Sequence, residues 1–247
     1  MSKLLEENIT LFINYFREQV QLIEGHCPKT RDGDLHSRIL YTAVLDAISR
    51  SIFVQQSNRE RTVGFIKNFC DWPECERISL PHLYQLARTK IEPELADLRN
   101  FTIRNMSQWI RGDVVRLNHD PLFSDVENLW PHNNGKPSII DGVRLKWLQH
   151  CHLFYSYRNS LVHEFKTAGY HAELFEKDEL YYIQVTEYRA EGSRELDRSW
   201  QLQYTAMFLK KLCDSSISNL EDYLVQKQID PIATLVPGKY WIRELDT

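Results

Sequence analysis

"LHSRILYTAVLDAISRSIFVQQ" occupies residues 35–56 and is the stretch that decides the fold class. Its apolar residues recur every three or four positions, which is the period of one face of an α-helix. We therefore predict an amphipathic helix that packs against a core, with Asp34 as its N-cap. The apolar face is formed by Ile39, Leu40, Ala43, Val44, Ala47, Ile48 and Ile52.

Helical spacing recurs in several other segments of the chain. Gly25 and Gly169 follow two of these segments and are expected to end their helices, because glycine readily adopts the left-handed backbone found at helix ends. The stretch 92–142 is broken by Pro, Gly and Asn and is expected to be loop with short elements. Helices are predicted at residues 3–24, 59–70, 143–168 and 204–226, and from about Pro81.

The character of the sequence changes after the helix at 143–168. The next segments are rich in Tyr, Val, Ile and Trp and alternate in part, which predicts an antiparallel sheet of two or three strands. The fold class is therefore mainly α, with a small antiparallel β insertion near the C-terminus. The expected strands lie at 170–175, 180–188 and 198–206, with an extended tail at 229–245. We expect one domain over 1–247, made of a helical bundle core at 1–168, a β-hairpin elaboration at 170–205, and a C-terminal helix and tail at 206–247.

The composition is that of an ordinary globular protein. The chain has 247 residues and a formal net charge of -4, which argues against a uniformly positive surface for general DNA binding. Its five cysteines form no CxxC pair, so we expect unpaired thiols in a reducing cytoplasm and no metal site. No nucleotide-binding or hydrolase signature occurs, so no cofactor is expected. Glu6 and Glu7 interrupt any signal-peptide pattern, and no apolar run reaches the length of about 20 residues that a membrane span needs.

Four arginines are followed by a histidine five or six residues later, and this spacing alone distinguishes none of them. The fourth pair, Arg158 and His163, combines a helix interior, an adjacent asparagine and apolar neighbours. Pro81 interrupts the second pair, and the other two lack this surround. The pairs are Arg31/His36, Arg77/His82, Arg144/His150 and Arg158/His163.

A helical projection of residues 143–168 places Arg158 at the centre of an apolar arc. Asn159, His152 and His163 lie together on one flank of this arc. A guanidinium inside a packing face is costly unless it meets an anion. Arg158 therefore either pairs with a carboxylate, such as Asp46 or a neighbouring glutamate, or faces a cleft that binds an anionic ligand. The arc consists of Trp147, Cys151, Phe154, Tyr155, Val162 and Phe165.

The hexapeptide "RNSLVH" at 158–163 resembles the R-x4–6-H motif of the HEPN superfamily, in which a polar residue often follows the arginine. The resemblance implies an all-α, HEPN-like helical bundle and a metal-independent endoribonuclease with no cofactor. It also implies a homodimer that acts on RNA, in a toxin, stress or defence role, with an antitoxin or regulatory partner as a further possibility. Some relatives have a tyrosine two residues after the histidine that a partner enzyme modifies, and here that position is Phe165.

The residue types suit this chemistry. Attack by the RNA 2′-hydroxyl needs a base and an acid, and an imidazole such as that of His163 serves either role. The guanidinium of Arg158 can stabilise charge on the phosphoryl oxygens, and Asn159 can orient His163 or bind the phosphate. Arg158 and His163 project about 140° apart on one helix, which favours a site composed across a two-fold axis.

Other interpretations stay open from the sequence. The first alternative is a non-catalytic HEPN-like module that binds a nucleotide, RNA or a protein partner, and the second is a helical scaffold in which Arg158 forms a buried ion pair. Several aromatic residues in the β region are able to stack on bases, although strand aromatics are more often core or cross-strand pairs. These residues are Tyr181, Tyr182, Tyr188, Trp200 and Tyr204.

Overall fold

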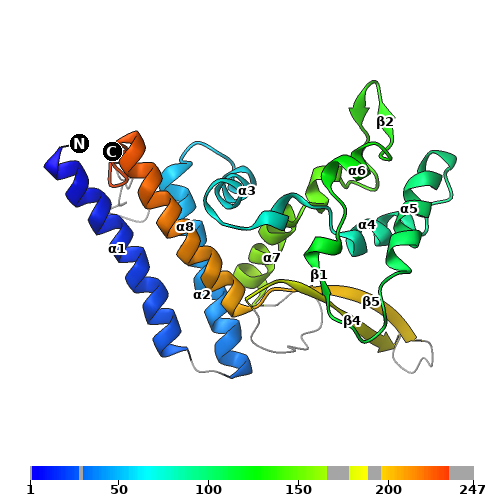
Figure 1. Ribbon diagram of the computed structural model, residues 1–247, viewed down its shortest axis with the longest axis horizontal. Helices are drawn as coiled ribbons and strands as arrows, with labels where there is room; N and C mark the ends of the chain where they lie inside the picture. The colour runs from blue at the N-terminus through cyan, green and yellow to red at the C-terminus, as the bar shows by residue number, and fades with distance from the viewer. Residues whose placement is uncertain (1, 28–29, 166–177, 189–195, 234–247) are drawn as a thin grey trace. The chain divides into compact units, whose positions relative to one another are not determined.

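The computed structural model describes residues 2–27, 30–165, 178–188 and 196–233 (Figure 1). Helices make up most of these residues, and the strands are few, so the prediction of a mainly α fold is confirmed. The chain divides into two compact units, Met1–Asp71 with Leu212–Thr247, and Trp72–Lys211. In this division residues 72–165 group with the sheet, and the single domain with a helical bundle core at 1–168 stays a prediction.

The first unit is built from amphipathic helices. Helix α1 buries one face, formed by Ile9, Phe12, Ile13, Phe16, Val20 and Ile23, which is the face that its spacing predicts. A capping box between Ser57 and Glu60 fixes the start of α3, because each side chain accepts a bond from the other residue's backbone N–H. The helices are α1 (Lys3–His26), α2 (Arg31–Ile52), α3 (Asn58–Phe69) and the part of α8 (Ala206–Lys227) that follows Lys211.

The start of α2 differs from the prediction. Thr30 is the N-cap, and its hydroxyl accepts the backbone N–H of Gly33, so the helix begins four residues earlier than expected. Asp34 lies inside the helix and binds Arg38 one turn later, a pair in which the arginine is fully buried. The carboxylate is therefore used by a buried guanidinium and is not available to the helix end. Helix α1 likewise runs through Gly25 to His26.

The second unit combines short helices with two small sheets. Its helical elements are η1 (Pro73–Glu76), α4 (Leu80–Ala87), η2 (Pro93–Leu95), α5 (Ala96–Met106), η3 (Leu117–His119), α6 (Phe123–Glu127), η4 (Leu145–Leu148), α7 (His150–Glu164) and the first turns of α8. Its strands are β1 (Val115–Arg116), β2 (His132–Asn133), β3 (Lys136–Pro137), β4 (Tyr181–Tyr188) and β5 (Leu196–Gln203).

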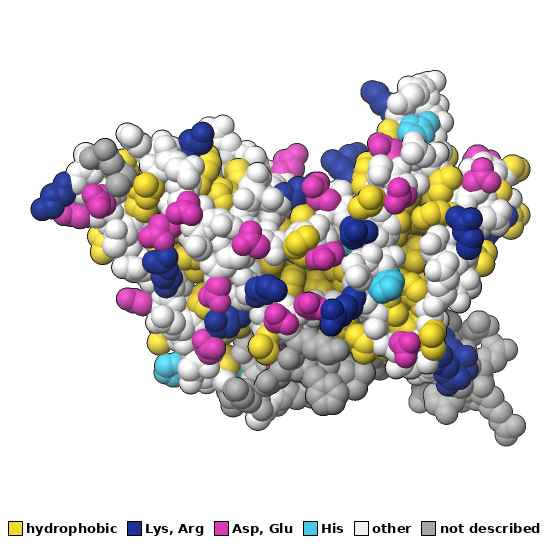
Figure 2. All heavy atoms as spheres, viewed as in Figure 1, with side chains coloured by type: hydrophobic (Ala, Val, Ile, Leu, Met, Phe, Trp, Pro, Cys, Tyr) yellow, Lys and Arg dark blue, Asp and Glu magenta, His cyan; other side chains and the backbone are white. Residues whose placement is uncertain are grey.

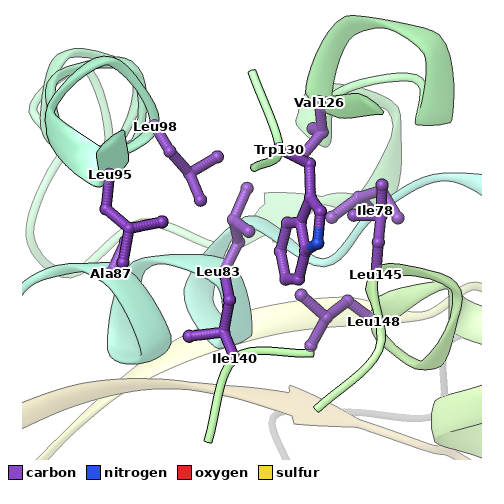
Figure 3. Close-up of a cluster of buried hydrophobic side chains, with 10 residues drawn as sticks. All are labelled: Ile78, Leu83, Ala87, Leu95, Leu98, Val126, Trp130, Ile140, Leu145 and Leu148. Atoms are coloured by element: carbon purple, nitrogen blue, oxygen red, sulfur yellow. The ribbon is translucent and has the colours of Figure 1, made fainter. Parts of the chain in front are cut away.

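A cluster of buried hydrophobic side chains is formed by α4, α5, α6 and the segments around them (Figure 3). Trp130 is its largest member and is 2% exposed, and its indole N–H donates to the carbonyl of Ser138 at 2.8 Å. The indole therefore fills the core without leaving a buried donor unsatisfied. The cluster consists of Ile78, Leu83, Ala87, Leu95, Leu98, Val126, Trp130, Ile140, Leu145 and Leu148.

The two sheets are antiparallel. β2 and β3 form a hairpin through Asn134 and Gly135, both with positive φ, which is the backbone of a tight two-residue hairpin turn. The other sheet has the order β1-β4-β5, and in it Gln184 faces Trp200. The predicted strands at 180–188 and 198–206 are thus confirmed in essence. The expected strand at 170–175 lies outside the described residues, as does the tail from 234 onward.

The long helix predicted at 143–168 is divided and shorter. A 3-10 turn, η4, precedes Gln149, whose backbone is extended, and α7 begins at His150. Tertiary backbone bonds explain the break, because Ser79 N–H donates to the Leu148 carbonyl and His150 N–H donates to the Arg77 carbonyl. These bonds hold Gln149 in an extended conformation between η4 and α7. At the other end α7 stops at Phe165, so Gly169, which lies outside the described residues, does not end it.

Basic and acidic side chains are interspersed over the face of the molecule seen in Figure 2. This mixture agrees with the small net charge of -4. Among the described residues, no helix combines the length and the apolar character that crossing a bilayer requires. None of the five cysteines, all of which the structure describes, forms a disulfide.

Candidate functional site

Arg158 lies on the buried side of α7, as the projection predicts. Its side chain is only 8% exposed, and the buried residues Phe154, Tyr157 and Leu161 share this side of the helix. Tyr157 stacks on Tyr204 with ring centroids 4.1 Å apart, which fixes the rotational setting of α7 against the chain that follows β5. The pKa of Tyr204 is raised well above its usual value by burial and by the neighbouring Tyr157.

Asn159 binds the arginine. The guanidinium Nη1 of Arg158 donates to Asn159 Oδ1 at 2.9 Å. Asn159 itself is half-buried. The sequence left two roles open for Asn159, orientation of His163 or a bond to the phosphate, and its contact with Arg158 is a third.

His163 lies on a different side of the helix. It is exposed in the last turn of α7, whereas Arg158 is buried, in agreement with a separation of about 140° for five residues. His152, which the projection placed on the same flank as His163, is 8% exposed. A single α7 therefore does not bring the arginine and the histidine to one point.

Phe165 departs from the projection. It was placed within the apolar arc, but the helix has ended there and the residue is 62% exposed with φ 51°. A left-handed residue turns its side chain away from the direction that helical geometry would give. The buried side of α7 thus ends near Leu161 and Val162. In the last turn His163 and Glu164 are exposed to solvent.

The carboxylate that the sequence suggested for Arg158 belongs to the first unit. Asp46 is buried and forms ion pairs there with Arg50 at 3.0 Å and with Arg61 at 3.6 Å. Arg61 also donates to Asn58 Oδ1 at 2.9 Å. An ion pair between Asp46 and Arg158 stays a prediction.

A second polar cluster, which the sequence did not reveal, lies in the second unit around Asp120. We call it the Asp120 network, and its members are Ser79, His82, Asp120, His150 and Tyr182. Asp120 Oδ2 lies 2.7 Å from His150 Nε2 and 2.8 Å from the Tyr182 hydroxyl. Asp120 Oδ1 accepts the backbone N–H of Leu80 at 2.9 Å. Ser79 Oγ lies 2.8 Å from the Tyr182 hydroxyl and 2.7 Å from His82 Nδ1.

The number of hydrogens that each group carries determines which group donates and which accepts in the Asp120 network. If Tyr182 gives its one hydroxyl proton to the carboxylate, its oxygen accepts from Ser79, and Ser79 in turn accepts from His82 Nδ1. His150 donates its Nε2–H to Asp120, and its Nδ1 is buried with no hydrogen-bond partner. A neutral His150 leaves only a lone pair there, so the neutral ring avoids a buried, unsatisfied N–H.

Burial sets the protonation of two members. Burial and the Asp120 charge raise the pKa of Tyr182 well above its usual value. Burial of the ring and the neighbouring His150 lower the pKa of His82 to about 4, although part of that side chain is exposed. Tyr182 and His82 are therefore uncharged near neutral pH.

The Asp120 network has a structural role. Ser79, Asp120, His150 and Tyr182 are each at most 1% exposed, so no substrate reaches them in this conformation. They join the starts of α4 and α7 to the η3 segment and to β4. A carboxylate near two helix N-termini is also favoured by the helix dipoles. The network thus fixes the beginning of the helix that carries Arg158 and His163.

One sequence signal pointed toward this network. His82 and His150 belong to two of the Arg–His pairs that were set aside, the first because Pro81 interrupts the helix and the second because it lacks an adjacent asparagine in an apolar surround. Ser79 before Pro81 also has the form of a helix N-cap. In the structure Ser79 makes no capping bond, because Pro81 at the second helical position has no N–H to donate and the Ser79 hydroxyl instead contacts Tyr182 and His82. Asp120 and Tyr182 come from distant segments, and no local pattern links them.

No group of three or more His, Cys, Asp or Glu side chains suited to a metal ion occurs among the described residues. Comparison with known proteins adds no relative: no protein-family model, no curated protein and no solved structure matches the chain. The choice of a function therefore depends on the residues and geometry of the chain itself.

Proposed function

We propose that this protein is a metal-independent endoribonuclease of HEPN type that cleaves RNA through attack of the 2′-hydroxyl on the adjacent phosphate. The observation that carries the proposal is the arrangement on α7: a buried arginine bound by the next residue, Asn159, and an exposed histidine one and a half turns later. These residues belong to the "RNSLVH" pattern, and they lie in helix α7 with the arginine buried and the histidine exposed.

The chemistry assigns a role to each residue. His163 is accessible and either removes the 2′-hydroxyl proton or protonates the leaving 5′-oxygen. Arg158 supplies a fixed cation for the charge that develops on the phosphoryl oxygens, and Asn159 holds one arm of the guanidinium. The products of this reaction are a 2′,3′-cyclic phosphate and a free 5′-hydroxyl.

The proposal includes a homodimer. Since Arg158 and His163 lie on different sides of α7, one protomer's arginine and its partner's histidine make a more plausible pair than the two on one helix. Free thiols fit a reducing compartment, so the proposal places the activity in the cytoplasm. A toxin, stress or defence role, and a regulatory partner such as an antitoxin, belong to the proposal through the HEPN resemblance alone.

The test is RNA cleavage in EDTA. We expect wild-type protein to produce cyclic phosphate ends, and His163→Ala to lower the rate about 100-fold or more, as loss of a general acid or base does. The matched control is His132→Ala, which removes another exposed histidine from the β2–β3 hairpin. Because Arg158 is buried, Arg158→Lys is the informative variant, since it keeps the charge and loses the planar fork. Full activity in both motif variants removes the motif from the mechanism.

One observation favours a second candidate, a non-catalytic HEPN-like module that binds a nucleotide, RNA or a protein partner. Arg158 is 8% exposed, which limits direct contact with a phosphate in the isolated chain. RNA or nucleotide binding without cleavage under any metal condition, whether or not it depends on Arg158, supports this alternative over the enzyme.

A further inference from the structure

The sheet of the second unit has one face on which aromatic and cationic residues meet. In the β4–β5 register Tyr182 faces Leu202, Gln184 faces Trp200 and Thr186 faces Arg198. Because side chains alternate along a strand, these six residues share one face of the sheet. They include one cation and no carboxylate. Gln184 and Trp200 are half-buried, while Thr186 and Arg198 are exposed.

Trp109, from the turn after α5, completes this face. Its ring lies 5.2 Å from that of Tyr182 and 5.2 Å from that of Trp200, which it meets edge to face at 89°. Both tryptophans keep part of their surface exposed. Arg111, two residues after Trp109, is exposed as well. Each of the two partly exposed indoles thus has an exposed arginine two residues away along the chain.

The other aromatic residues of this region behave differently. Tyr181, Tyr182 and Tyr204 are at most 4% exposed, so they belong to the core and are not available to stack on a base. The side chain of Tyr188 lies outside the described part of the chain. Of the five aromatics that the sequence left open for base stacking, Trp200 is therefore the one with an accessible ring among those described.

We propose that Trp109, Arg111, Gln184, Thr186, Arg198 and Trp200 form a binding surface for single-stranded RNA, which we call the Trp109–Trp200 surface. Indole rings stack on unpaired bases, guanidinium groups meet the phosphates, and the amide and hydroxyl of Gln184 and Thr186 can bond to base edges. The inference deepens the proposed function, since this surface and α7 belong to the same unit, and it rests on RNA being the substrate.

Charge and shape favour RNA over a protein partner. The surface carries two exposed cations, Arg111 and Arg198, which can meet the phosphates of a polyanion, and one exposed acid, Asp113, lies two residues beyond Arg111. Aromatic residues on an antiparallel sheet are also a known way of stacking bases. A paired duplex hides its base faces, so the surface should prefer single strands.

The experiment measures binding apart from cleavage. A fluorescent oligouridine of about 12 nucleotides, with 2′-O-methyl sugars that block 2′-hydroxyl attack, is titrated with the full-length protein and followed by anisotropy. We expect Trp200→Leu to weaken binding about 10-fold, the effect of losing one stacked base. Trp200→Phe should retain most of the affinity, which separates stacking from simple loss of fold.

Trp147→Leu is the matched control. Trp147 is a half-buried tryptophan with an arginine, Arg144, over its ring at 5.4 Å, but it lies on η4 outside the surface. Its replacement should leave binding unchanged. Arg198→Ala should lower the slope of log Kd against log salt by about 0.7, which is one phosphate contact on a single strand. The same oligonucleotide annealed to its complement should bind more weakly, and a DNA version tests whether the sugar matters.

The outcomes separate this inference from the ribonuclease proposal. Wild-type binding that Trp200→Leu leaves unchanged, in a variant that keeps the circular dichroism of the wild type, overturns the surface even if RNA is cleaved. Absence of binding up to about 10⁻⁴ M protein, the weak end of non-specific affinity, overturns it as well. If binding depends on Trp200 but unmodified RNA is not cleaved, the result supports the Trp109–Trp200 surface and contradicts the endoribonuclease proposal.

Discussion

Asp120 is the residue on which the buried polar contacts of the second unit converge. Its two carboxylate oxygens accept from His150, Tyr182 and the Leu80 backbone, and its own carbonyl accepts from Arg77 Nη1 at 2.6 Å. A buried carboxylate is tolerated only with such a set of donors, since an unpaired charge costs several kcal/mol.

Asp120→Ala should therefore be strongly destabilising. The change leaves three donors unsatisfied in the core, and we expect the free energy of unfolding to fall by about 3–5 kcal/mol. Tryptophan fluorescence during urea unfolding is a suitable measurement, because Trp72, Trp109, Trp130, Trp147 and Trp200 all lie in the second unit. Asp113→Ala, at an exposed carboxylate, should stay within about 0.5 kcal/mol of wild type. A loss below about 1 kcal/mol in Asp120→Ala contradicts the structural role.

His82 gives the same network a dependence on pH. Its pKa is lowered from 6.5 to about 4 in the folded chain, so between these values the unfolded chain binds a proton that the folded chain does not. Stability from His82 is present above pH 6.5 and is lost as the pH falls toward 4. The partly exposed side chain makes this effect smaller than full burial would.

Thermal melts across this pH range test the assignment. The melting temperature of the wild type should fall more steeply on acidification than that of His82→Gln, which keeps a hydrogen-bonding group near Ser79. His132→Gln, at an exposed histidine, should follow the wild type. Parallel curves for wild type and His82→Gln contradict the lowered pKa.

Individual residues were predictable where a single helix determines their environment. The buried position of Arg158 followed from the 3.6-residue period of α7, and so did its separation from His163. Asp120 and Tyr182 were not predictable, because they meet His150 only through tertiary packing. The Arg158–Asn159 contact was predictable only in part. The two residues are adjacent in the sequence, but packing sets the side-chain rotamer that brings them into contact.

At the scale of elements, periodicity located the long helices and tertiary bonds set their ends. α1, α2 and α8 were all predicted from apolar spacing. The start of α2 moved because Thr30 takes the cap and Asp34 binds Arg38. The start of α7 moved because distant backbone groups bind Leu148 and His150. Local propensity does not contain these long-range partners.

The end of α7 offers a direct test of backbone strain. Phe165 adopts φ 51°, which costs a side-chain-bearing residue about 1 kcal/mol relative to glycine. The ring is 62% exposed, so its removal loses little packing. Phe165→Gly should raise the free energy of unfolding by about 0.5–1 kcal/mol in chemical denaturation. Phe165→Ala keeps the strain and should give no gain, and a glycine variant no more stable than the alanine variant contradicts the argument.

At the scale of the whole molecule, the division into two units places every proposed element of function in one of them. The α7 motif, the Asp120 network and the Trp109–Trp200 surface all belong to Trp72–Lys211. The sequence predicted the motif and the helices but assigned α7 to an N-terminal bundle. Contacts between segments far apart in the chain decide such groupings, and helical periodicity does not report them.

The composite site across a two-fold axis is the strongest claim at this scale, and mixing two inactive variants tests it. Arg158→Lys and His163→Ala each lack one half of the motif, so each homodimer should be inactive. If one protomer's arginine acts with its partner's histidine, half of the randomly formed dimers are mixed and one of their two sites is intact. We then expect about a quarter of wild-type cleavage after subunit exchange. If both residues act within one chain, no mixed dimer has a complete site and cleavage stays absent. Copurification of differently tagged subunits shows that mixed dimers have formed. If these mixed dimers are inactive, the composite site is excluded. A protein that sediments as a monomer and still cleaves RNA excludes it as well.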